Sequence, residues 1–231
     1  MTNRTIWNIE ICNHEQWTAE WFTARAWRIT GTRLESVMSS RKNTREELMY
    51  TMIYERIAPL QDQYQSGIME RGHIVESVVK ELFASENIES VWFLRRTDNE
   101  YIGISPDGVI IQDGIITRAV EIKAPLWKNF IKYWVQDKIP DEYFYQVIMY
   151  FLVIESLQSL DFIIHSPHPY DERVRTKRIT VTRSELTAEI QQAEMAIFDF
   201  IAEFHNVTSL FIENVKKHWP IGIPDFSDCH P

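Results

Sequence analysis

Cysteine is nearly absent from this 231-residue sequence, and the two that occur, Cys12 and Cys229, stand far apart. There is no Cys-x-x-Cys pair, so the sequence predicts neither a disulfide framework nor a thiolate zinc site. The amino terminus lacks the apolar core of a signal peptide, and we see no apolar run long enough to span a bilayer. These absences predict a cytoplasmic protein without a membrane segment.

Basic charge is also in short supply, with 24 Lys and Arg against 33 Asp and Glu and a net charge of -9. Such a chain cannot coat nucleic acid by bulk charge, so any contacts with phosphates have to be local. An enzyme that acts on nucleic acid is not excluded. The hydrophobic content of 45% and the absence of internal repeats predict a single domain over residues 1–231.

Hydrophobic periodicity predicts helices that alternate with strands. The helices are expected in residues 17–27, from 32, at 44–57, 67–84, 126–138 and 141–157, and after 182; the strands at 91–94, 101–104, 109–111, 115–122, 160–165 and 174–182. Capping boxes are predicted at Thr44 with Glu47 and at Thr182 with Glu185. The expected fold class is α/β (α+β), with a central mixed sheet that contains a hairpin and is flanked by helices.

The segment "SPDGVIIQDGIITRAVEIKAP", residues 105–125, predicts that hairpin. Asp113-Gly114 suits a tight primed turn between two apolar runs. Side chains alternate along the returning strand, so Glu121 and Lys123 share one face, and folding back brings Asp107 toward them. A pair of charges at this spacing is also common on a solvated surface, but the rigid turn before Asp107 and the proline after the strand favour a built site.

Two carboxylates with a nearby lysine favour a divalent ion bound by oxygen, Mg²⁺ or Mn²⁺, rather than zinc. Asp107 and Glu121 can bind the metal, and the Ile122 carbonyl can add a ligand. Lys123 can orient or deprotonate a water and neutralise charge developing on a phosphate. This chemistry is phosphodiester hydrolysis.

Further short motifs accompany this group, and in chain order they are Trp21, Arg25 and Ile29-Thr30-Gly31-Thr32; Arg71-Gly72 with Glu76; Ser105-Pro106-Asp107-Gly108; Glu121-Ile122-Lys123 with Pro125; and Pro140, Tyr143 and Gln146. Together they resemble the phage lambda exonuclease family, the YqaJ-type viral recombinases, within the PD-(D/E)xK nuclease superfamily. The resemblance covers residues 17–155 and implies a restriction-endonuclease-like core. The strands, long helix and irregular tail of residues 160–231 match nothing that we can name.

The resemblance adds Glu76 and Gln146 to the catalytic group. Glu76 would reach toward the two carboxylates, where a second metal could bind; alternatively it is a polar residue beside a core stripe that pairs with Lys80. Gln146 would orient Lys123 or the water, and is ambiguous from the sequence alone. The family often has a second glutamine two residues later, where this chain has Ile148.

The resemblance also implies a pocket for a terminal 5′-phosphate formed by Arg25, Thr32 and Ser105, with Thr32 in place of the usual serine. A guanidinium fork and two hydroxyls suit a phosphate chemically. Arg25 could instead cap a helix or stack on Trp21. In residues 127–138, lysines alternate with aromatics, which is typical of either an amphipathic core helix or a surface that tracks a strand of nucleic acid.

The function implied is that of an alkaline-type deoxyribonuclease: a Mg²⁺-dependent 5′-to-3′ exonuclease that degrades one strand of linear double-stranded DNA and leaves a 3′ overhang for phage-type recombination. A homotrimeric ring and a single-strand annealing protein as partner are implied as well. The alternatives are an endonuclease of the same superfamily, of the restriction or junction-resolving type, and an inactive DNA-binding module.

Overall fold

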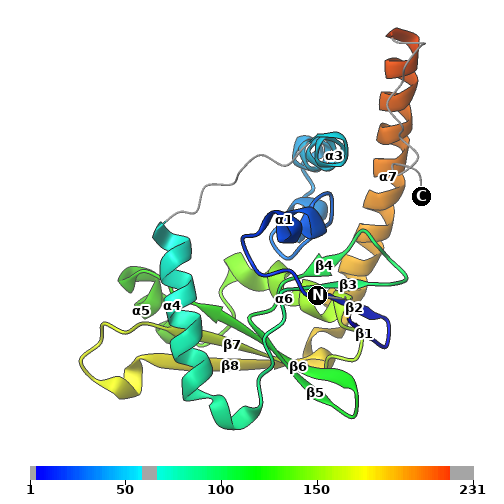
Figure 1. Cartoon of the computed structure of the whole chain (residues 1–231). Coiled ribbons are helices and arrows are strands. Elements are labelled where there is room, and N and C mark those ends of the chain that lie inside the picture. The colour runs from blue at the N-terminus through cyan, green and yellow to red at the C-terminus, as the bar shows by residue number, and fades with distance from the viewer. Residues whose placement is uncertain (1–3, 59–66, 219–231) are drawn as a thin grey trace.

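The computed structural model describes residues 4–58 and 67–218, of which residues 67–74 are described by their backbone only. The strands in these residues form two four-stranded sheets with helices around them (Figure 1). The α/β class expected from the sequence is confirmed. The strands expected in one central sheet are divided between the two.

The larger sheet is mixed and contains the predicted hairpin. Its strands, in spatial order, are β5 (Gly108–Gln112), β6 (Ile115–Lys123), β7 (Ser159–His165) and β8 (Thr176–Thr182). The pair β5/β6 is antiparallel, β6/β7 parallel and β7/β8 antiparallel. Strand β6, which carries the predicted catalytic residues, therefore has a neighbour on both sides.

The smaller sheet is antiparallel and includes two strands near the amino terminus that were not expected from the sequence. Its strands are β1 (Arg4–Ile6), β2 (Ile9–Cys12), β3 (Phe93–Arg96) and β4 (Gly103–Ile104). Strand β2 pairs with β3, with Ile9 opposite Arg96. The strands β1 and β2 are held by a partner far away in the sequence.

The helices lie close to where periodicity predicts them: α1 (Ala19–Arg25), α2 (Leu34–Met38), α3 (Lys42–Ile57), α4 (Gly67–Leu82), α5 (Trp127–Gln136), α6 (Phe144–Val153) and α7 (Thr187–His218), with 3₁₀ turns at Ala84–Glu86, Asp141–Tyr143, Glu172–Val174 and Arg183–Leu186. The capping box of Thr182 and Glu185 is confirmed. The one predicted at Thr44 is wrong, because α3 begins at Lys42 and the Thr44 N–H already donates to the Arg41 carbonyl inside the first turn.

Helices cover both faces of the larger sheet. On one face, Val75 and Val79 of α4 pack against Val120 and Ile122 of β6. On the other face, the main core includes Ala119 of β6 and the buried residues of α6. Because side chains alternate along β6, Glu121 and Lys123 lie on the face that α6 covers.

Helix α7 extends beyond the body of the molecule (Figure 1). The helix over residues 183–218 is, by length and composition, long and apolar enough to cross a bilayer, so the expectation that no such run exists is wrong. Its buried residues recur every three or four positions, as in a helix packed on a protein core. Length and composition alone therefore do not assign α7 to a membrane. The predicted irregular tail after Trp219 lies outside the described residues.

Candidate active site

The β5–β6 hairpin brings Asp107 and Glu121 to one end of the larger sheet. Its turn residues Asp113 and Gly114 have φ angles of 51° and 77°, both in the left-handed region, as the predicted primed turn requires. The Asp107 Oδ2 accepts a hydrogen bond from the Ile122 N–H at 2.6 Å. The Asp107 carboxylate is thus fixed by the backbone of the strand that carries Glu121.

Glu121 is 2% exposed, and three side chains donate to its carboxylate. Gln146 Nε2 lies 2.8 Å from Oε1, and the Lys123 ammonium pairs with the same oxygen. The Tyr150 hydroxyl donates to Oε2. The interpretation of Glu121 and Lys123 as a solvated surface pair is therefore wrong, and the ambiguous Gln146 contacts the predicted group directly.

The carboxylates repel one another at this buried position. Burial raises the pKa of Asp107 well above its usual value, and the neighbouring charges of Glu121 and Glu76 raise it further; Lys123 and the Ile122 N–H act in the opposite direction. Glu76, on α4, therefore lies near Asp107, as predicted. A cation among these carboxylates would relieve the repulsion.

The oxygen ligands present fit a small divalent ion. Among the described residues no group of three or more His, Cys, Asp or Glu side chains could hold a metal, which leaves Asp107 and Glu121 as a pair. Mg²⁺ is commonly held by one or two carboxylates, with waters and substrate phosphates completing its shell. The pair meets this requirement, and the Ile122 carbonyl and Glu76 stay predictions as further ligands.

Lys123 is held as a cation. Its burial by itself lowers the pKa, but the carboxylates of Glu121 and Asp107 outweigh this and raise the pKa above its usual value. The ammonium also lies 5.0 Å from the centroid of the Tyr143 ring. In this arrangement Lys123 supplies positive charge and can donate hydrogen bonds.

Arg25 lies in a cavity of about 530 Å³ whose lining also includes Thr32, Arg33 and Lys123. Its guanidinium donates to the Ser105 hydroxyl and stacks over Trp21, with Cζ 4.3 Å from the ring centroid. The predicted pocket residues are thus brought together beside Lys123, and the stacking alternative holds at the same time. Burial, followed by the charge of Arg33, lowers the pKa of Arg25 to about 10, which leaves it charged at neutral pH.

Two residues of the candidate site, Tyr150 and Arg33, were not predicted from the sequence. Tyr150 lies four residues after Gln146 on α6, so the spacing of a helix face could have revealed it. Arg33 is held by a two-pronged ion pair with Glu55, at 2.9 and 2.5 Å, and no local pattern places it beside Arg25. Arg71 and Gly72 lie outside the residues whose side chains are described.

Helix α5 is amphipathic, as one of its two interpretations predicts. Phe130 and Tyr133 are buried, whereas Trp127 is 75% exposed. Lys132 and Lys138 form exposed ion pairs with acidic neighbours. A surface that tracks nucleic acid along this helix stays a prediction. A separate cavity of about 600 Å³ beside α7 contains none of the predicted site residues.

Residues 20–156 match the model of the YqaJ-like viral recombinase domain. The match covers more than half of the 231 residues, and the chain belongs to the YqaJ-like viral recombinase family. The resemblance seen in the motifs is confirmed. A comparison with curated proteins finds no match to the chain.

Solved structures of exonucleases share the fold. The alkaline exonuclease LHK-Exo from Laribacter hongkongensis is 23% identical with a TM-score of 0.74, over 87% of this chain and 100% of that one. The structure of LHK-Exo in complex with dAMP has a TM-score of 0.75 to this chain, with the same sequence identity and coverage. A phage-related exonuclease from Haemophilus somnus 129PT is 12% identical with a TM-score of 0.57, over 80% of this chain and 96% of that one. The shared fold extends beyond the segment that matches the family model.

Proposed function

We propose that this protein is a Mg²⁺-dependent exonuclease that degrades one strand of linear double-stranded DNA from its 5′ end and leaves a 3′ overhang. The observation that carries the proposal is the group formed by buried Glu121 with the partly buried Asp107 and Lys123, beside a cavity that contains Arg25. Membership of a viral recombinase family supports a role in phage-type recombination, and the alkaline exonucleases with the same fold support the reaction.

The carboxylates of Asp107 and Glu121 and the Ile122 carbonyl would hold Mg²⁺, with Glu76 nearby for a second ion. When bound, the metal polarises the scissile phosphate and lowers the pKa of a water, and Mn²⁺ is expected to substitute. Gln146 keeps Glu121 in place through its bond to Oε1. Lys123, as an ammonium, neutralises negative charge that develops on the phosphate and orients the attacking water.

The Arg25 cavity gives a reason for cleavage from an end. A guanidinium that is stacked on Trp21 and bonded to Ser105 is already oriented, so less freedom is lost when a terminal phosphate binds. Thr32 lines the same cavity and offers a hydroxyl. Because Lys123 also lines it, an end held by Arg25 lies next to the catalytic group. An endonuclease has no use for such a pocket.

We infer the assembly and the partners from the resemblance in the motifs and from the net charge. A subunit with a net charge of -9 has little affinity for DNA, so a ring, expected to be a homotrimer, would retain the duplex by topology. A single-strand annealing protein would take up the 3′ overhang. The proposed place of action is the cytoplasm, that of the host cell if the protein is encoded by a phage.

The test is digestion of an end-labelled linear duplex and of a closed circular duplex with Mg²⁺. An exonuclease releases label from 5′ ends of the linear DNA and leaves the circle intact. Cutting of the circle would establish the endonuclease alternative, and no cutting of either substrate, with the protein folded, would leave the inactive DNA-binding module.

A further inference from the structure

Tyr150 makes a contact with the predicted metal ligand Glu121 that no motif assigns. It lies on α6 and is fully buried, with 0% of its surface exposed. Its hydroxyl donates to Oε2 of Glu121, the oxygen that neither Gln146 nor Lys123 contacts. A phenol is protonated at neutral pH, so it can donate to the carboxylate.

The three donors divide the two oxygens of Glu121 between them. Gln146 and Lys123 both use Oε1, whose two lone pairs are then occupied. Tyr150 uses one of the two lone pairs on Oε2 and leaves the other. Without the hydroxyl, the carboxylate would be held at one oxygen only, and rotation about its last bond would be resisted less.

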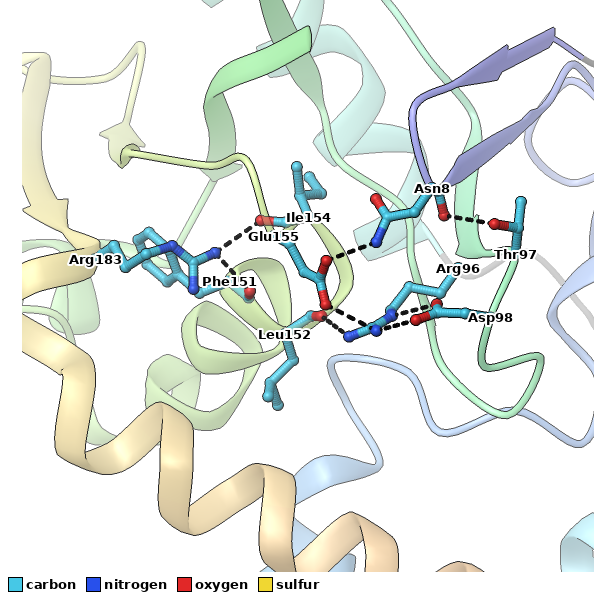
Figure 2. A network of polar contacts seen from close by, with 9 residues as sticks. All are labelled: Asn8, Arg96, Thr97, Asp98, Phe151, Leu152, Ile154, Glu155 and Arg183. Carbon is cyan, nitrogen blue, oxygen red and sulfur yellow. Dashed lines mark hydrogen bonds and ion pairs between the residues drawn. The ribbon is translucent and has the colours of Figure 1, made fainter.

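Helix α6 itself is anchored at its carboxyl end, just after Tyr150. Arg183 donates to the carbonyls of Phe151 and Ile154 at 2.7 and 2.8 Å (Figure 2). From the opposite side, Arg96 contacts the Leu152 carbonyl at 3.4 Å and pairs with Glu155 at 2.8 Å (Figure 2). The last turn of α6 is therefore fixed by two arginines from different parts of the fold, and the position of the Tyr150 hydroxyl is fixed with it.

We propose that Tyr150 is a positioning residue, whose hydroxyl sets the orientation of Glu121 that binding of a divalent ion requires. The inference rests on the proposed metal-dependent function and extends it to a residue outside the family motifs. Hydrogen-bonding partners of metal ligands typically change metal affinity or activity by about 10- to 100-fold when they are removed. Tyr150→Phe removes only the hydroxyl and keeps the ring that fills the core.

The experiment is calorimetric titration of metal-free protein with Mn²⁺, for the parent, Tyr150→Phe and Tyr145→Phe. Tyr145 lies on the same helix and packs against the core, so its variant is a matched loss of a hydroxyl. We expect Tyr150→Phe to bind Mn²⁺ about 10- to 100-fold more weakly and Tyr145→Phe to bind as the parent does. Nuclease activity of Tyr150→Phe should recover as Mn²⁺ is raised, which a general loss of folding would not produce.

Mn²⁺ affinity of Tyr150→Phe equal to that of the parent would overturn the proposal, whatever its melting temperature. Tyr150→Met, which fills part of the same space with a flexible apolar side chain and no donor, repeats the measurement if the first variant unfolds. A parent that binds no Mn²⁺ would contradict the proposed function and this inference with it. If the parent protein and Tyr150→Phe bind Mn²⁺ with the same affinity, only the inference about Tyr150 is contradicted, and the proposed function stands.

Discussion

If the protein is the proposed exonuclease, it should prefer 5′-phosphorylated ends, and replacing Arg25 with alanine should remove that preference. The guanidinium is charged at neutral pH, and only one of its five N–H groups is used by Ser105. It lies in a cavity of about 530 Å³, so the remaining donors can reach a phosphate. The variant keeps Asp107 and Glu121, and we expect its loss to fall on positioning of the end rather than on the chemical step.

The magnitude follows from one charge-assisted hydrogen bond. Such a bond contributes roughly 1.5–3 kcal/mol. Since about 1.4 kcal/mol corresponds to tenfold in rate, digestion of phosphorylated ends should slow by about 10- to 150-fold. The rate on 5′-hydroxyl ends, which cannot use the contact in the same way, should change little.

The assay is the initial velocity on two linear duplexes that differ only in the 5′-phosphate, for the parent, Arg25→Ala and Arg25→Lys. Lysine keeps the charge but loses the fork and most of the stacking on Trp21, so it should restore part of the preference. Arg41→Ala removes an exposed arginine and is the control for loss of charge.

Two results would refute the reasoning. An unchanged preference for the phosphorylated end in folded Arg25→Ala would remove Arg25 from the pocket. No preference in the parent would contradict the pocket itself and favour the endonuclease alternative. Circular dichroism of each variant checks folding, because loss of the stacking on Trp21 can reduce stability by about 0.5–2 kcal/mol.

Three further predictions concern the carboxylates, the lysine and the anchor of α6. Asp107→Asn should abolish cleavage but raise the melting temperature of the metal-free protein at neutral pH. The pKa of Asp107 is higher in the folded than in the unfolded chain, so the ionised carboxylate destabilises the fold as the pH rises, and the neutral amide removes this cost. An unchanged or lower melting temperature would contradict this. Lys123→Ala should retain Mn²⁺ binding in calorimetry but reduce turnover by about a hundredfold or more; near-normal turnover would make the site assignment wrong. Arg183→Ala should reduce the free energy of unfolding in urea by roughly 1.5–3 kcal/mol, since it leaves buried carbonyls of α6 without their charged donor; stability equal to that of the parent would show that water replaces the arginine.

Local signals in the sequence predicted much of the larger sheet. Asp113 and Gly114 specify their turn without help from distant residues, and the alternation along β6 placed Glu121 and Lys123 on one face. The capping box at Thr182 also depends only on neighbours in the chain. For these elements, local chemistry and the final fold agree.

Distant contacts account for what the sequence did not reveal. Strands β1 and β2 are only three and four residues long, too short for a periodic pattern. Strand β2 is ordered by pairing with β3, which follows four α-helices, α1 to α4, in the described chain. The Tyr150 contact requires α6 to lie over β6, which no local pattern specifies. The capping box predicted at Thr44 is wrong because α3 begins two residues earlier, at Lys42.

The parallel pairing of β7 with β6 has a consequence for where the protein can be cut. The family match ends at residue 156, but β7 begins at Ser159 and places Phe162 opposite Glu121. A fragment that stops at the family boundary would leave β6, which carries the proposed catalytic residues, with one open edge whose unpaired backbone groups can pair with other chains. It would also lose Arg183. Exchange of modules between relatives, in the laboratory or by recombination of genes, should therefore preserve activity only when the crossover lies after β8 and Arg183 rather than at residue 156, where the family match ends.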